Sequence, residues 1–367
     1  EIIKKDKKKF DIILLTADKN YKEILKQAKI LKAKNLIITN EKSFKKLEKK
    51  KIGNINIFND YNSFNRIFKN RIDYVMSSIS GIHGLEPTVK IIKHTKKIAI
   101  ANKEAIICGW HLIKKDLKKY KTKFVPVDSE HFSIYYSIKD ININYLENIF
   151  LTASGGPLKD LPLNKFKNIK VSDALKHPNW KMGKKISIDS ATMMNKVFEI
   201  IEAHKIFDIP YKKLKILVHP KSYVHAIVKF NDGMIKIIAH DTNMIIPIHN
   251  SIYSPEIKFL KTKKININKL NNLDFTNVDY KKFPLVKIIS KLSKRNSLYE
   301  TVIVATNDEL VKKFLQKKIN FQDISKKMYK FITSKDFIKY KNVKAKSVDK
   351  IVKLNNYVRF KINNLSI

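Results

Sequence analysis

Short apolar segments alternate with amphipathic segments over the first third of the chain. Apolar runs of strand length begin at residues 11, 35, 54, 74 and 97, and stretches with helical spacing, such as YKEILKQAKILKA, lie between them. A helical crossover returns the chain in the same direction, so repeated strand–helix units build a parallel sheet with helices on its faces. We therefore expect an α/β fold with a doubly wound parallel sheet over residues 1–127.

The predicted strand ends carry polar segments. Ligands of such sheets bind beyond the carboxyl ends of the strands, which here are followed by TADKN, SSISGIHG, ANKE and DSEH. No GxGxxG turn follows the first apolar run, although a dinucleotide pyrophosphate needs such a turn. Since the first residue, Glu1, is not a methionine, we expect a first strand and its glycine-rich loop to lie upstream.

The rest of the chain falls into three parts. Residues 128–250 contain the apolar runs IFLTA and LVHPKSYVHAIVK, which we predict to be strands of a second α/β domain. Residues 251–283 are rich in Asn and Lys and lack a clear period, so we predict a connection. Residues 284–367 contain segments with helical spacing and no glycine, which predict a helical bundle.

Two acidic residues follow the extended segment that ends at Val127. In an extended chain, residues two apart point the same way, so Asp128 and Glu130 are expected on one face. Neighbouring carboxylates repel each other unless a proton or cation lies between them. With Glu199 they would form an all-oxygen site suited to Mg²⁺ or Mn²⁺ rather than zinc. We expect His131 to be a structural hydrogen-bonding residue.

Residues 177–203, HPNWKMGKKISIDSATMMNKVFEIIEA, contain many chemically useful side chains. We predict a loop up to Gly183, a short strand at 186–189, and a helix from Ala191 that is capped by Asp189 or Ser190. On that helix an amide, an ammonium and a carboxylate lie within one turn, a combination that suits an anionic, metal-chelating substrate. The alternative is an ordinary solvated ion pair. These three side chains belong to Asn195, Lys196 and Glu199.

The segment Ser154-Gly155-Gly156 follows the apolar run IFLTA. Successive backbone N–H groups at such a position can form a concave anion site, to which a serine hydroxyl adds a donor. An ordinary tight turn is the alternative.

Charge and composition exclude several classes of protein. The net charge of +42 suggests a nucleic-acid partner, but the lysines are spread over the whole chain, so we expect a solvated surface and no nucleic acid. No apolar run approaches the roughly 20 residues that span a bilayer, so we expect no membrane partner. With a single cysteine, Cys108, the chain forms no internal disulfide, which favours the cytoplasm.

Four strings, VDSEH, ASGGP, HPNWKMGKKISIDSATMMNK and ANKE, resemble 1-deoxy-D-xylulose-5-phosphate reductoisomerase. The resemblance runs from about Phe10 to the C-terminal helices. It implies a Rossmann-like NADPH-binding domain (1–127), a catalytic domain with one divalent cation (128–250), a connection (251–283) and a C-terminal helical domain (284–367). It also implies a homodimer and a phosphosugar substrate, which is rearranged by cleavage and re-addition and then reduced by NADPH.

The resemblance also assigns roles to residues. It places the metal ligands at Asp128, Glu130 and Glu199 and the phosphate contacts at Ser154, Ser190, Asn195 and Lys196. It places contacts to the substrate backbone at Lys103, Ser129 and His177, with Trp180 on a closing flap. Glu130 and Glu199 would touch the substrate as well as the metal, and the implied catalytic residues are Lys103, Glu130, His177 and Glu199. Cofactor-side positions fall on Lys19, Asn20, Asn102, Glu104 and Gly183.

The sequence departs from the family pattern in two places. The family's GSTGSIG-type phosphate loop is not present near the start of this sequence, and Asp18 stands where many relatives have glycine. The first departure leaves open an alternative, in which the chain binds the metal and the sugar phosphate without carrying out the reduction. A basic nucleic-acid-binding protein is the alternative from a different class.

Overall fold

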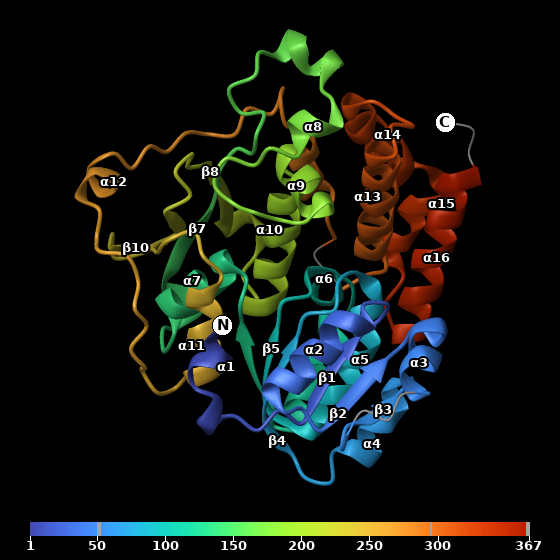
Figure 1. Cartoon of the computed structure of the whole chain (residues 1–367). Coiled ribbons are helices and arrows are strands. Elements are labelled where there is room, and N and C mark those ends of the chain that lie inside the picture. Colours follow the sequence, from blue (N-terminus) through green and yellow to red (C-terminus); the bar gives the residue numbers. More distant parts are fainter. Residues whose placement is uncertain (50–52, 294–295, 365–367) are drawn as a thin grey trace.

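Six parallel strands form two three-stranded sheets in the N-terminal part of the chain (Figure 1). A computed structural model gives the structure over residues 1–49, 53–293 and 296–364. The first sheet has the order β1-β2-β3 and the second the order β4-β5-β6. These strands are β1 (Leu14–Ala17), β2 (Asn35–Ile38), β3 (Asn56–Phe58), β4 (Ile72–Ser77), β5 (Thr95–Ile100) and β6 (Lys123–Pro126).

Helices join these strands, so the predicted alternation is confirmed. Ahead of β1 lie α1 (Ile2–Lys5) and η1 (Lys7–Lys9). The connecting helices are α2 (Tyr21–Leu31), α3 (Glu41–Glu48), α4 (Phe64–Ile67), α5 (Leu85–Ile91) and α6 (Lys103–Lys119). The last two residues of the helix predicted at 41–51 lie outside the described residues. In β2, Leu36, Ile37 and Ile38 are fully buried, as expected for a parallel strand that is covered on both faces.

A four-stranded mixed sheet forms the middle of the molecule, with the order β10-β9-β7-β8. Strands β7 and β8 are parallel, and β9 runs antiparallel to both β7 and β10. The strand material predicted at 217–229 belongs to two strands, because the chain turns between them and Ser222 has a positive φ of 50°. The strands are β7 (Leu146–Ala153), β8 (Leu214–Val218), β9 (Val224–Phe230) and β10 (Ile235–Ala239).

Helices α7 (Ser129–Ile138) and α10 (Met194–Phe207) pack on this sheet. Ile134 of α7 and Ile200 of α10 join Leu146, Ile149 and Leu151 of β7 in one buried cluster. Figure 1 shows α10 between the sheet and the C-terminal helices. Because apolar neighbours surround it, the polar side chains of α10 are buried as well.

The strand predicted at residues 186–189 is wrong, because this segment is helical. Helix α9 (Lys184–Ala191) starts after Gly183, and α10 starts at Met194 rather than at Ala191. Within α9, Lys185 pairs with Asp189 at 3.0 Å and the Ser187 hydroxyl donates to the Gly183 carbonyl. These contacts between residues four apart form on a helix. Met193, at a φ of 62°, separates the two helices, so neither Asp189 nor Ser190 is an N-cap.

The C-terminal part is helical, as predicted from residue 284. Helix α13 packs against α6, α14 and α16. The connection before it contains one short helix, α12, and its Thr276 bridges to Val218 at the end of β8. Before residue 284 lie α11 (Ile245–Tyr253) and α12 (Ile267–Asn271), and the helices of the C-terminal part are α13 (Tyr299–Leu315), α14 (Phe321–Thr333), α15 (Lys335–Ile338) and α16 (Val348–Asn364).

Short helical segments complete the described elements. Short helix α8 (Val171–Ala174) precedes the 177–183 loop, and the 3-10 turns are η2 (Tyr61–Ser63), η3 (Ile82–Gly84), η4 (Ile92–His94), η5 (Ile143–Tyr145), η6 (Leu163–Asn168), η7 (Tyr211–Lys213), η8 (Pro284–Lys291) and η9 (Lys339–Asn342).

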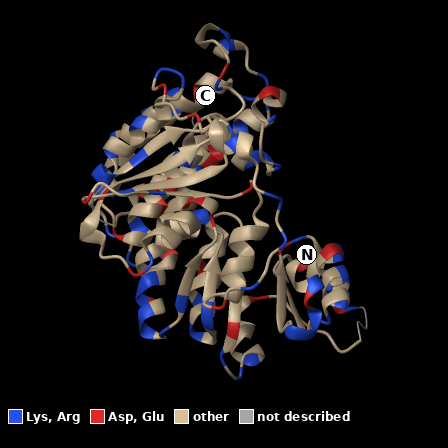
Figure 2. Ribbon diagram, turned by 90° about the vertical axis from the view of Figure 1, so that its left-hand side faces the viewer, with Lys and Arg blue, Asp and Glu red and all other residues tan. Residues whose placement is uncertain are grey.

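Lys and Arg lie on elements in every part of the view in Figure 2. In the part of the chain that the structure describes, no helix has both the length and the apolarity to cross a membrane.

Candidate active site

A cavity of about 280 Å³ opens where the N-termini of α6, α7 and α10 approach the Ser154–Gly156 loop and the 177–183 loop. All of the residues predicted to bind metal or substrate line it, although they come from separate segments of the chain. They are Lys103, Asp128, Ser129, Glu130, Ser154, His177, Ser190, Asn195, Lys196 and Glu199.

Three carboxylates converge in this cavity. Oxygen atoms of Asp128, Glu130 and Glu199 lie within 4.8 Å of one another. The extended geometry predicted for the first two is wrong, because the chain enters α7 at Ser129, so that Asp128 is the N-cap and Glu130 lies in the first turn. The positive end of the helix dipole at this turn favours both negative charges.

Two ammonium groups lie among the three carboxylates. Lys196 Nζ donates to Glu130 Oε1 at 2.7 Å and also contacts Glu199. Lys103 Nζ donates to Asp128 Oδ2 at 2.6 Å. The side chains of Lys196 and Glu199 are 4% and 1% exposed, so their contact is a buried ion pair rather than a solvated one.

The electrostatics of the three carboxylates fit a divalent cation. Burial and the neighbouring Glu130 raise the pKa of Glu199 to about 7. The pKa of Glu130 is lowered despite its burial, because the Lys196 ammonium stabilises its charged form. Asn195 Oδ1 is buried with no hydrogen-bond partner among the described residues. Crowded, buried oxygen ligands of this kind suit Mg²⁺ or Mn²⁺.

His177 is held as a donor toward Ser154. Its Nδ1 accepts hydrogen bonds from the backbone N–H groups of Asn179 and Trp180, at 3.2 and 3.0 Å. The ring proton therefore lies on Nε2, which is 3.0 Å from Ser154 Oγ. Burial lowers the pKa of His177, which favours this neutral form. The imidazole thus holds a serine hydroxyl at the cavity wall.

The two glycines after Ser154 let this loop approach α9. Both have positive φ, 82° at Gly155 and 67° at Gly156, and a Cβ on Gly156 would lie 2.7 Å from the Ser190 carbonyl oxygen. The Gly156 N–H donates to Ser154 Oγ at 3.0 Å. The turn therefore brings Ser154 and Ser190 to the same end of the cavity.

The 177–183 loop forms part of the cavity wall. Asn179 Nδ2 donates to the Pro220 carbonyl at 2.6 Å and to Ser222 Oγ at 2.8 Å, which ties the loop to the turn between β8 and β9. The Trp180 ring lies 6.3 Å from the His225 ring. Trp180 and Met182 both line the cavity.

The predicted cofactor-side residues lie outside this cavity. Asn102 is buried and caps α6: it accepts from the Ala105 N–H at 2.7 Å and donates to the Gly81 carbonyl at 2.8 Å. Asn20 caps α2, and its neighbour Lys19 follows β1. Gly183 is the N-cap of α9.

Glu104 belongs to an ion-pair network that joins three regions. Lys185 Nζ of α9 lies 2.8 Å from Glu104 of α6, 3.0 Å from Asp189 and 3.2 Å from Asp308 of α13. Asn307 Nδ2 adds a 2.7 Å hydrogen bond to Asp189. This network fixes α9, and with it the end of the 177–183 loop, against α6 and the C-terminal helices.

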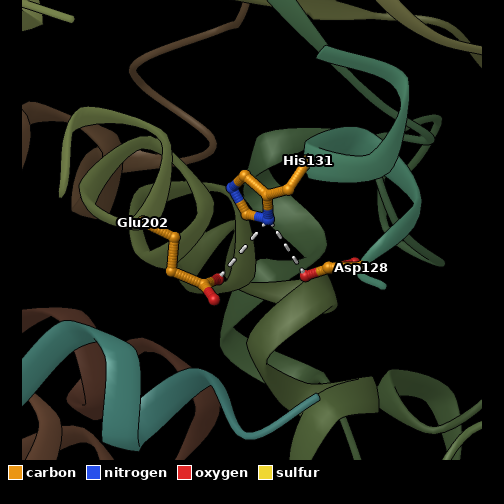
Figure 3. A group of neighbouring side chains, drawn as sticks. All are labelled: Asp128, His131 and Glu202. Atoms are coloured by element: carbon orange, nitrogen blue, oxygen red, sulfur yellow. Dashed lines mark ion pairs between the residues drawn. The ribbon is translucent and has the colours of Figure 1, made fainter. Parts of the chain in front are cut away.

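Three residues near the cavity were not among the predicted site residues. Glu202 follows Glu199 by one turn of α10, a spacing that could have indicated it. His131 Nε2 donates to the Glu199 carbonyl at 2.9 Å, which matches its expected structural role, and its Nδ1 faces Asp128 and Glu202 (Figure 3). His225 lines the cavity, and burial lowers its pKa to about 4.

Comparison with known protein families shows to which family the chain belongs. Models of 1-deoxy-D-xylulose 5-phosphate reductoisomerase and its C-terminal domains match residues 1–109, 124–207 and 241–361. The 1-deoxy-D-xylulose 5-phosphate reductoisomerase of Pelagibacter ubique (strain HTCC1062) is 57% identical over all of this chain and 95% of the relative. The chain belongs to the 1-deoxy-D-xylulose 5-phosphate reductoisomerase family.

Solved structures of reductoisomerases share the fold of the whole chain. The Zymomonas mobilis enzyme in complex with NADPH superposes with a TM-score of 0.87 at 30% identity, over 100% of this chain and 95% of that one. A reductoisomerase in complex with NADPH, fosmidomycin and magnesium gives a TM-score of 0.90 at 27% identity, over 99% and 93% of the two chains. The expected Rossmann-like α/β fold with a second sheet domain and C-terminal helices is thereby confirmed.

Proposed function

We propose that this protein converts 1-deoxy-D-xylulose 5-phosphate to 2-C-methyl-D-erythritol 4-phosphate, using NADPH and a divalent cation, in the synthesis of isoprenoid precursors. The observation that carries the proposal is a single cavity that contains three converging carboxylates and, beside them, serine, amide and ammonium donors for a phosphate. Family membership over the whole chain supports it.

Asp128, Glu130 and Glu199 are the residues that would hold the cation. When bound, Mg²⁺ or Mn²⁺ supplies Lewis acidity and a template for neighbouring substrate oxygens. Lys103 and Lys196, whose ammonium groups contact these carboxylates, would then be displaced from them. The two lysines and the cation therefore share the same set of negative charges.

The remaining cavity residues divide between the two ends of the substrate. The phosphate would contact Ser154, Ser190, Asn195 and Lys196, which lie on the Ser-Gly-Gly loop, α9 and α10. Lys103, Ser129 and His177 would hydrogen-bond the oxygens of the carbon backbone. Binding energy from the phosphate, which is remote from the reacting carbons, can hold those carbons in a reactive geometry. Trp180 and the rest of the 177–183 loop would exclude water.

We further propose that NADPH lies on the side of the cavity that faces the N-terminal sheets, near Lys19, Asn20, Asn102, Glu104 and Gly183. Asn102 and Glu104 would act through the backbone they fix at the start of α6, because their side chains are already bonded within the protein. In the corresponding division of the chain, residues 1–127 would bind the cofactor and residues 128–250 would form the catalytic domain. Residues 251–283 would be a connection, and residues 284–367 the helical domain.

Product analysis by NMR tests the proposed reaction. The protein is incubated with 1-deoxy-D-xylulose 5-phosphate and Mg²⁺, with NADPH and without it. We expect 2-C-methyl-D-erythritol 4-phosphate in the complete mixture and no reduced product when NADPH is left out. Metal-dependent substrate binding without reduced product in the complete mixture would instead favour the alternative of a chain that binds metal and sugar phosphate but does not reduce.

Metal affinity should depend on pH through Glu199. Burial and Glu130 raise the pKa of its carboxyl group to about 7, and a cation must displace the proton that the group carries below this pH. We therefore expect the affinity for Mn²⁺ to fall by up to about tenfold per pH unit below pH 7 and to level off above it. Calorimetric titration between pH 5.5 and 8.5 measures this slope, and a constant affinity across the range would contradict it.

We also propose that the protein is a homodimer whose partner pairs at strand β10. This strand is the edge of the four-stranded sheet, and Ile235 and Ile237 are 53% and 49% exposed. An exposed apolar edge strand is a template for pairing with another chain. In the 251–283 connection, Ile257 and Phe259 are also exposed, at 96% and 90%. A second copy of the chain is the proposed occupant.

Sedimentation velocity tests the dimer. The variant Ile237→Lys places a charge on the apolar edge and is expected to shift a dimeric protein to monomer, because burying an unpaired ammonium in an interface is unfavourable. Lys215→Glu, which changes a charge in strand β8 at the other edge of the same sheet, is the matched control and should stay dimeric. A wild-type protein that sediments as a monomer, or a dimer that persists in Ile237→Lys, would contradict the proposal.

A cytoplasmic location is the remaining proposal. The one cysteine, Cys108, is free and buried in α6, which suits a reducing compartment.

A further inference from the structure

Glu202 is a buried carboxylate next to the cavity. The proposed reaction assigns no role to it. It lies one turn after Glu199 on α10, and its side chain is 3% exposed. Its Oε2 atom is 3.4 Å from Lys103 Nζ and 4.0 Å from His131 Nδ1. Figure 3 shows Glu202 and Asp128 approaching the same ring nitrogen of His131. Glu202 does not line the cavity itself, and it pairs with a side chain that does, Lys103.

Among the described residues, three carboxylates lie within 4.0 Å of the Lys103 ammonium. They belong to Asp128 at 2.6 Å, Glu199 at 3.4 Å and Glu202 at 3.4 Å. The first two belong to the proposed metal set of Asp128, Glu130 and Glu199, whereas Glu202 falls in a second group of possible ligands, with Asp128 and His131. A divalent cation and an ammonium group repel each other strongly at short range in a poorly solvated site. They cannot both use Asp128 and Glu199 at close distance.

We propose that Glu202 is a positioning residue, which takes up the Lys103 ammonium when a divalent cation occupies Asp128, Glu130 and Glu199. The proposal rests on the metal site of the proposed function. A buried ammonium that loses its partners is strongly destabilised, so Lys103 needs a carboxylate outside the metal set. Glu202 is suitably placed, because its Oε2 is buried without a hydrogen-bond partner and can still accept one.

The surroundings of Glu202 hold it in this position. Its helix is buried on nearly all sides, and His131 is anchored to the Glu199 carbonyl through Nε2 at 2.9 Å. The other ring nitrogen, Nδ1, faces both Glu202 and Asp128. Lys103 can therefore move from Asp128 toward Glu202 by a small displacement of its own side chain, while α7 and α10 stay in place.

A double-mutant cycle of Mn²⁺ binding tests the inference without substrate or NADPH. Titration calorimetry is done on wild type, Glu202→Gln, Lys103→Met and the double variant. Glu202→Gln is expected to weaken Mn²⁺ binding about tenfold, because Lys103 then stays on Asp128 and Glu199 and competes with the cation. In the Lys103→Met background the same change should alter the affinity by less than about threefold, since coupling between contacting residues appears as non-additivity.

The other possible results distinguish a failure of the proposed role of Glu202 from a failure of the metal site. An equal loss of affinity in both backgrounds, or no loss in either, would overturn the role of Glu202 through Lys103. Wild-type protein that binds no Mn²⁺ would instead overturn the metal site itself. Lys103→Met alone should tighten Mn²⁺ binding by removing a competing cation, and weaker binding would also count against the inference. Glu202→Asp, which keeps the charge, should retain Mn²⁺ affinity closer to wild type than Glu202→Gln does.

Discussion

Glu199→Gln is expected to abolish metal-dependent turnover, with a loss in kcat of about a thousandfold or more. Glu199 is 1% exposed and contributes an oxygen within 4.8 Å of those of Asp128 and Glu130. The amide keeps the size of the side chain but removes the negative charge that a divalent cation needs. The measurement is the rate of NADPH oxidation with 1-deoxy-D-xylulose 5-phosphate across a range of Mg²⁺ concentrations.

Glu147→Gln is the matched control for this prediction. Glu147 lies on β7, is 39% exposed and pairs with Lys229 at 2.9 Å, outside the cavity. Its substitution should leave kcat within about twofold of wild type, as surface changes usually do. If Glu199→Gln kept the wild-type dependence on Mg²⁺, Glu199 would be removed from the metal set.

Lys196→Met is expected to raise the KM for the phosphosugar by about ten- to a hundredfold. The lysine is almost fully buried in α10 and lines the same cavity as Ser154 and Ser190, and a hydrogen bond to a charged group contributes about 1.5–3 kcal/mol. Steady-state kinetics with saturating NADPH and Mg²⁺ measure the change.

A substrate without the phosphate provides the control for Lys196. Wild type and Lys196→Met are compared on 1-deoxy-D-xylulose, which offers no phosphate to bind. The two proteins should differ little in kcat/KM for this compound, although both will use it poorly. An unchanged KM for the phosphorylated substrate would contradict the phosphate role and leave Lys196 as a counter-ion of Glu130 and Glu199.

The sequence predicted the fold well where the pattern is local. The alternation of apolar and amphipathic segments predicted the parallel strands, because strands such as β2 are buried on both faces and show as continuous apolar runs. Errors arose in short segments. Four residues of apparent alternation at 186–189 were assigned to a strand, whereas Lys185 pairs with Asp189 one helical turn away. The ion pair and the burial of α9 outweigh the alternation of apolar and polar residues over four positions.

The cavity residues were predicted from long sequence strings, but their arrangement was not. Asp128 and Glu130 meet Glu199 because α7 begins at Ser129 and lies beside α10, which depends on tertiary packing. Glu202 was missed for the same reason, because its partner Lys103 belongs to a different helix, α6. Glu104 was assigned to the cofactor side, and its contact with Lys185 of α9 could be seen only in the folded structure.

The rate of NADPH oxidation by the wild-type protein with 1-deoxy-D-xylulose 5-phosphate, before and after chelation of divalent cations, tests the central claim most directly. The account predicts oxidation that requires the substrate, stops on chelation and returns when Mg²⁺ or Mn²⁺ is added back. Oxidation that continues at the same rate in excess chelator, or no oxidation in the complete mixture, would contradict it.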